Sequence, residues 1–132
     1  MSTKFEIAGR ALPELFQNAA QRLLPALIDP EDVGETHRER LVVEAEDLSS
    51  LLKEWLTALL NLAQDQRILF HRVQIERLDT TPGKPYRILA SVVGELFDPL
   101  RHPLKLPMVG LKCDQAALSQ TQDVWNAEYR IG

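Results

Sequence analysis

The sequence predicts an α+β protein in which two helices pack on a mainly antiparallel, mixed sheet of about six strands. Apolar residues recur three and four positions apart over residues 12–27 and 48–64, the pattern of a helix with one buried face. Several shorter stretches alternate between apolar and polar residues, as half-buried strands do. With 132 residues, of which 45% are hydrophobic, the chain fits a two-layer domain spanning residues 1–132.

The first quarter of the chain supplies a short strand and the first helix. Residues 4–8 are expected to form the strand, and residues 12–27 the helix. Pro13 lies in the first helical turn, where the missing N–H has no partner within a helix. Pro25 lies near the end of the pattern, where it is expected to kink or end the helix.

The next segment repeats this order of strand and helix. Residues 38–46 alternate between polar and apolar side chains and are predicted to form a strand. Asp47 follows and suits an N-cap, because its carboxylate can accept the free N–H groups of the first turn. Within the helix over 48–64, Trp55 is predicted to be an anchor of the core.

The second half of the chain is predicted to consist of strands. The pair 68–78 and 86–93 is expected to form a hairpin, because turn-forming residues separate the two stretches. Residues 104–113 are expected to form a further strand, at an edge or with a bulge because Pro107 lies inside it. Residues 115–123 are expected to be a polar connector, and residues 124–131 the last strand.

Composition excludes several classes of protein. The single cysteine, Cys113, rules out a disulfide framework within one chain. No apolar run approaches the roughly 20 residues of a membrane-spanning helix, and the N-terminus lacks a signal-peptide pattern, so a cytoplasmic protein with no membrane contact is expected. The net charge of −4 disfavours strong direct binding of nucleic acid, which depends on clustered Lys and Arg.

The charges are unevenly distributed along the chain. Residues 28–47 hold eight acids and two bases, a net of −6, whereas residues 67–112 hold eight bases and four acids, a net of +4. This distribution indicates either a dipolar surface that orients a partner or ordinary solvated faces of strands and loops.

The segment over residues 94–105 is the most unusual part of the chain. Two acids and three possible cations fall within eleven residues, on a loop bounded by prolines: Glu95, Asp98, Arg101, His102 and Lys105. The three cations are suited to hold an anion or a carboxylate of a partner, since Arg offers a fork and Lys a point charge. Alternatively, the segment is a rigid connector whose charges pair with one another. There is no catalytic motif, such as a glycine-rich phosphate loop.

This segment resembles the signature of the archease family, which runs Gly-Glu-x-Phe-Asp-x-x-Arg-His-x-x-Lys. The chain keeps every fixed position of that pattern from Gly94 to Lys105. Residues 11–20 are similar to the first helix of the family, and residues 44–56 to its second strand and second helix. The resemblance implies a non-catalytic accessory protein that activates the RNA ligase of tRNA splicing. GTP or ATP would then belong to the ligase. No cofactor is expected for this chain itself, because it departs from the metal-site pattern of the family, as described next.

The resemblance also implies a divalent metal site, from which this sequence departs. Archeases are expected to hold the metal through aspartates near the two chain ends, and these would fall near Ser2 and Gly132. Neither residue carries a carboxylate side chain, and Ala58, Asn61 and Val109 also depart from the family pattern. The resemblance is therefore to a divergent member without the terminal metal-binding aspartates.

Three functions follow as hypotheses. The first is an archease-like accessory protein that binds a protein partner, for which Glu95, Asp98, Arg101, His102 and Lys105 dock the partner or hold the loop in shape. The second is a small nucleotide- or phosphate-binding protein or enzyme that uses Arg101, His102 and Lys105. The third is an interaction module unrelated to RNA.

The departure from the metal pattern gives a testable prediction. Because a hard divalent cation needs several oxygen ligands, we expect weak or no binding of Mg²⁺, Ca²⁺ and Mn²⁺ at the chain ends. Isothermal titration of the protein with each ion measures this directly. Micromolar binding that maps to the two ends would contradict the prediction.

Overall fold

The computed structural model describes residues 3–105 and 109–132 of the chain. Two α-helices and six strands make up most of it, and a single 3-10 turn follows the first helix. In chain order these are β1 (Thr3–Gly9), α1 (Leu12–Leu27), η1 (Pro30–Asp32), β2 (His37–Ala45), α2 (Leu48–Asp65), β3 (Ile68–Asp79), β4 (Tyr86–Leu96), β5 (Cys113–Thr121) and β6 (Val124–Ile131).

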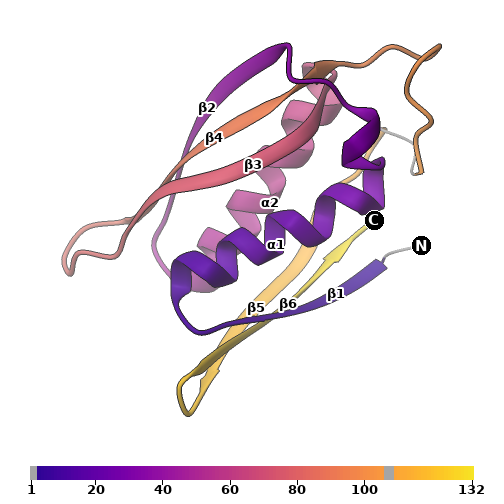
Figure 1. Cartoon of the computed structure of the whole chain (residues 1–132). Helices are drawn as coiled ribbons and strands as arrows, with labels where there is room; N and C mark the ends of the chain where they lie inside the picture. Colours follow the sequence, from indigo (N-terminus) through magenta and orange to yellow (C-terminus); the bar gives the residue numbers. More distant parts are fainter. Residues whose placement is uncertain (1–2, 106–108) are drawn as a thin grey trace.

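The strands form two three-stranded antiparallel sheets, in the orders β1-β6-β5 and β2-β4-β3. Each helix contacts strands of both sheets, and Figure 1 shows α1 and α2 lying between them. The predicted α+β class, with two helices packed on antiparallel strands, is confirmed. The structure differs from the predicted single sheet, because the strands divide into two sheets and the helices have a sheet on either side.

The buried face of each helix is broad enough to meet both sheets. In α2, eight of the eighteen residues are buried, and these include Trp55, which has no exposed surface. The indole Nε1 of Trp55 donates to the carbonyl oxygen of Phe16 at 3.0 Å, which joins the two helices in the core. The predicted role of Trp55 as a core anchor is therefore confirmed. Neither helix of the described part has the length and apolar character needed to cross a membrane.

Polar side chains of the helices satisfy backbone groups of nearby strands. Gln17 of α1 donates from Nε2 to the carbonyl oxygen of Val73 at 2.6 Å, and its Oε1 accepts the N–H of Ile75 at 2.8 Å. Because β3 is an outer strand of its sheet, these backbone groups face away from β4 and need another partner. Asp47 caps α2 as predicted, since its Oδ1 accepts the N–H of Ser50 at 2.8 Å.

The prediction for residues 104–123 was wrong in its division into strand and connector. Within 104–113 the structure describes residues 104, 105 and 109–113, of which only Cys113 belongs to a strand; Pro107 lies outside the described residues. The backbone of Leu111 instead pairs with Gln64 of α2, whose Nε2 donates at 2.7 Å and whose Oε1 accepts at 2.5 Å. The strand β5 follows, in the stretch expected to be a connector, because its polar residues occupy an outer, largely exposed strand.

Gly94, the first residue of the signature, lies where the backbone of β3 approaches β4 closely. A Cβ at this position would overlap the carbonyl oxygen of Leu69 and crowd the Cα of Phe70. The register of β3 against β4 shifts between Phe70 and Arg72, next to this contact. A residue without a side chain is therefore required here if β4 is to continue in register to Glu95.

Replacing Gly94 with alanine tests this requirement. We expect Gly94→Ala to lower the free energy of unfolding by about 3 kcal/mol, because the backbone of β3 has to move. Urea unfolding followed by circular dichroism measures the change. Ser91→Ala, on the same strand, is the matched control and should change stability by less than about 1 kcal/mol; equal effects of the two variants would contradict the close-approach explanation.

Candidate functional site

The signature residues cluster where β4 ends and the chain turns back. Glu95 is the penultimate residue of β4, and Asp98, Arg101 and His102 lie on the turn that follows. Lys105 lies beyond the turn, where its backbone N–H donates to the carbonyl oxygen of Leu27, the last residue of α1, at 2.8 Å. The structure therefore brings three of the five predicted residues into direct side-chain contact.

The carboxylate of Glu95 is the centre of this cluster. Only 8% of the residue is exposed, and its two oxygens receive three donors. Oε1 accepts the backbone N–H of Gly34 at 3.1 Å and lies 2.8 Å from Nε2 of His102, and Oε2 lies 2.5 Å from Nη1 of Arg101. The N–H of Gly34, with His102 and Arg101, lowers the pKa of Glu95 to about 2.

The side chain of His102 is fully buried, and its hydrogen bonds fix its protonation. Its Nδ1 accepts the backbone N–H of Asp98 at 2.8 Å and so carries no proton. The proton of the neutral ring is therefore on Nε2, which donates it to Glu95. Phe97 stacks on the ring with the centroids 6.1 Å apart.

The turn between Asp98 and His102 is held by its own backbone. The carbonyl oxygen of Asp98 accepts the N–H groups of Arg101 at 3.0 Å and of His102 at 2.9 Å. The side chain of Asp98 accepts the N–H of Leu100 at 3.0 Å, an Asx turn that fixes the tip. Asp98 thus shapes the turn.

The three cations predicted to hold an anion are in different environments. Arg101 is bound to Glu95, although 59% of its side chain remains exposed. His102 is neutral and buried, whereas Lys105 is exposed. The charges of Glu95 and Arg101 thus compensate each other within the turn, as the connector interpretation of the sequence requires.

Two residues of the site were not predicted from the sequence. Gly34 lies on the loop after α1, 61 residues from Glu95, and contributes only a backbone N–H, which leaves no signal in the sequence. That loop is fixed to β3 by His71, whose Nδ1 donates to the carbonyl oxygen of Pro30 at 2.9 Å. Leu100 is the second of these residues, and it is 95% exposed at the tip of the turn. The only sign of this exposure in the sequence is that the leucine is flanked by polar and turn-forming residues.

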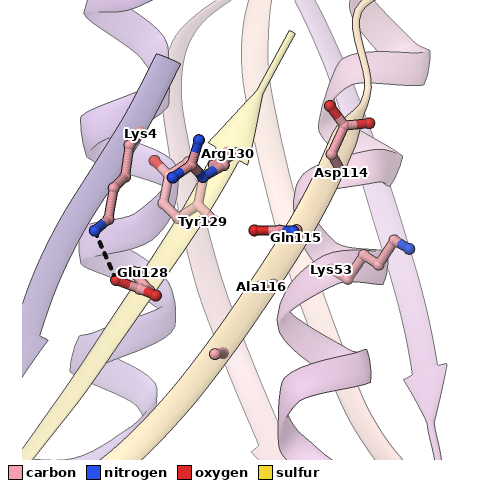
Figure 2. Close-up of a pocket in the computed structure, with 9 residues that line it drawn as sticks. Lys4, Lys53, Asp114, Gln115, Ala116, Glu128, Tyr129 and Arg130 are labelled. Carbon is pink, nitrogen blue, oxygen red and sulfur yellow. Dashed lines mark ion pairs between the residues drawn. The ribbon is translucent and has the colours of Figure 1, made fainter. Parts of the chain in front are cut away.

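A separate cavity of about 370 Å³ opens across β1, β6 and β5 beside α2. Figure 2 shows Lys4 reaching toward Glu128 on one side, with Lys53 and Asp114 on the other. Lys4 is bound by Glu128 at 3.1 Å and by Glu6 at 3.2 Å, and Glu128 makes the largest contribution to raising its pKa. The cavity therefore carries side chains of both signs of charge.

The metal site that the family resemblance implies does not fit the side chains of residues 3–105 and 109–132. Among the described residues, no three side chains of His, Cys, Asp and Glu lie close enough together to hold an ion. The position near Ser2 lies outside the described residues, and Gly132 offers no side chain.

The fold and the site define an α+β protein with two helices between two antiparallel sheets and an ion-paired turn at the end of one sheet. The chain belongs to the archease family: the model described as "Archease protein family (MTH1598/TM1083)" matches residues 3–130. The resemblance predicted from the signature is thus confirmed.

Relatives and a solved structure agree with this assignment. The chain is 36% identical over 126 residues to Protein archease of Methanosarcina mazei, covering 95% of this chain and 85% of that protein. Protein archease of Aeropyrum pernix is 25% identical, over 93% of this chain and 85% of its own length. The solution structure of Methanobacterium thermoautotrophicum protein 1598 superposes with a TM-score of 0.74 at 18% identity, covering 98% of this chain and 91% of that one, and so shares the fold.

The lowered pKa of Glu95 predicts how stability depends on pH. Because the folded state favours the carboxylate, its contribution is fully present above the ordinary pKa of 4.5 and is lost as the pH falls toward 2. We expect Glu95→Gln to be less stable than the wild type at pH 7, and the difference to shrink between pH 4.5 and 2. Thermal unfolding of both proteins across this range is the measurement. A difference that is independent of pH would contradict the charge-based explanation.

Proposed function

We propose that this chain is a non-catalytic accessory protein that binds an RNA ligase of tRNA splicing and promotes its activation. The observation that carries the proposal is membership of the archease family over residues 3–130. Any GTP or ATP consumed would be bound by the ligase, and this chain would contribute a surface that contacts the ligase.

The geometry of the turn after β4 supports a binding role. Glu95, Arg101 and His102 fix the turn internally, and the exposed part of Arg101 together with Lys105 faces solvent. A turn held in one conformation loses little conformational freedom when a partner binds, which favours affinity. Glu95, Arg101 and His102 thus shape the loop, and Arg101 and Lys105 would offer charge to a partner.

The phosphate-binding alternative has less support from this geometry. A phosphate needs several free donors directed at one point, whereas Arg101 is bound to Glu95 and the ring of His102 is buried. Only Lys105, among the three cations of that hypothesis, has an exposed side chain without a described side-chain hydrogen bond or ion pair.

Binding to the ligase from the same source tests the proposal. We expect the wild-type chain to bind the ligase and to raise its rate of guanylation and its number of turnovers. The double variant Arg101→Ala/Lys105→Ala should bind about tenfold more weakly, the loss expected for two exposed contact residues. Biolayer interferometry and a gel assay of ligase guanylation measure the two effects.

Matched variants separate binding from folding. Arg77→Ala/Lys84→Ala removes the same charge from the distant β3–β4 hairpin and should leave binding unchanged. Lys105→Ala alone keeps the contact of Arg101 with Glu95 and should weaken binding with a melting temperature within about 3 °C of wild type. Absence of ligase binding by the wild type would overturn the proposal, and stabilisation of the chain by ATP, GTP or GMP would favour the phosphate-binding alternative.

A further inference from the structure

We propose that the outer edge of β2 is a self-association surface, along which two copies of this chain pair antiparallel about Val42. The pairing would join the β2-β4-β3 sheets of both copies into one continuous sheet. Such an interface is isologous, because the same strand contributes to it from each copy. The inference goes beyond the proposed function, since it concerns a second copy of the chain and not the ligase.

The edge of β2 differs from the edges of the other three outer strands. An outer strand directs every second N–H and C=O away from its neighbour, and these groups need another partner. On β3, the side chain of Gln17 is that partner. On β1, Nδ2 of Asn18 donates to the carbonyl oxygen of Ala8 at 2.8 Å. On β5, Oγ of Ser49 accepts the N–H of Leu118 at 3.3 Å.

The outer backbone of β2 has no comparable partner within residues 3–105 and 109–132. Its residues pair with β4 on one side, and no hydrogen bond of the described chain reaches its backbone from the other side. Figure 1 shows β2 at the outer margin of its sheet. A strand of nine residues is therefore available for pairing with another strand.

The exposed side chains of β2 carry a self-complementary order of charge. Arg38, Arg40, Val42 and Glu44 lie on one face, because they alternate with the less exposed residues of the strand. Glu46 is also exposed and continues the order as the first residue after β2. Two cations, one apolar residue and two carboxylates thus follow one another at every second position.

Pairing about Val42 places each cation opposite a carboxylate. Arg40 of one copy lies opposite Glu44 of the second copy, and Arg38 lies opposite Glu46. Opposite charges directly across a strand pair stabilise it, and like charges destabilise it. A register centred on Arg40 or on Glu44 would put like charges face to face. The order of charge therefore favours the register centred on Val42.

The ion pairs within each chain are compatible with this register. Nη2 of Arg40 lies 3.3 Å from Oε2 of Glu76 on β3, and Nε of Arg87 on β4 lies 3.6 Å from Oε1 of Glu44. These pairs leave 72% of the Arg40 side chain and 55% of the Glu44 side chain exposed, so both can contact a second copy. Across the interface the charges would alternate in sign, in the order Arg87, Glu44, Arg40 and Glu76.

The residue on the symmetry axis is apolar. Val42 is 51% exposed, and it would face its own equivalent in the second copy. Charged side chains usually protect an edge strand because they repel a second copy. On β2 the same kind of residue attracts a second copy in one register, and Val42 adds an apolar contact at the centre.

The pairing would leave the turn after β4 accessible. His37 at the start of β2 pairs with Gly94, so Glu95 and the turn lie beside that end of β2. In an antiparallel pair the starts of the two β2 strands lie at opposite ends. The dimer would therefore present two copies of the turn, one at each end of the joined sheet.

Sedimentation velocity of the full chain, from about 10 to about 500 μM, tests self-association. We expect a reversible change from monomer to dimer within this range, because a single strand pair gives a small interface and small interfaces bind weakly. Val42→Lys should weaken dimerisation about tenfold, since two ammonium groups would meet on the axis. Val124→Lys, at an exposed valine of β6, is the matched control and should leave dimerisation unchanged.

Exchange of charges tests the register. Neither Arg38 nor Glu46 makes an ion pair within the part of the chain that the structure describes, so their substitution leaves the described ion pairs intact. Arg38→Glu and Glu46→Arg should each weaken dimerisation about tenfold, because each puts like charges opposite one another. A mixture of the two single variants, or both substitutions in one chain, should restore association.

The outcomes decide the inference. A monomer at every concentration up to about 500 μM would overturn it, as would equal effects of Val42→Lys and Val124→Lys. Absence of restoration in the mixture and in the double variant would overturn the register and with it the proposed pairing. Melting temperatures within about 3 °C of the wild type exclude unfolding as the cause of a lost dimer.

Discussion

An enclosed carboxylate needs partners for its charge, and at Glu95 this need organises the end of the β2-β4-β3 sheet. A buried charge without partners is strongly unfavourable, so the structure has to deliver donors to both oxygens. The N–H of Gly34, the ring of His102 and the guanidinium of Arg101 meet this need. The loop after α1 and the turn after β4 are therefore held by the same side chain.

The position of Glu95 depends in turn on contacts elsewhere in the fold. Gly94 allows β3 to approach closely enough for β4 to stay in register up to this residue. With the helices between two sheets, outer strands and connecting segments lack neighbours on one side, and Gln17 and Gln64 supply the missing backbone partners. The signature residues thus fix the turn after β4, whereas Gln17 and Gln64 fix the outer strand β3 and the segment at Leu111.

The sequence predicted those parts of the fold that repeat a periodic pattern. Both helices, the β3–β4 hairpin and the cap at Asp47 are present, because each follows from local spacing and local chemistry. The stretch 104–113 was predicted as an edge or bulged strand, yet a side chain of α2 takes the place of a neighbouring strand at Leu111. The contiguous signature brought Glu95, Arg101 and His102 together correctly, but the N–H of Gly34 could not be predicted, since any residue can provide one.

The signature forms an internal clamp, in which His102 is neutral and donates to Glu95. The proton position of the His102 ring tests this most directly, and long-range ¹H–¹⁵N correlation spectra at pH 7 report it. We expect a single tautomer with the proton on Nε2 and none on Nδ1. We also expect Glu95→Gln to change the ring signals of His102 more than those of His37 or His71. A proton on Nδ1, or a ring that averages between tautomers as an exposed histidine does, would contradict the clamp.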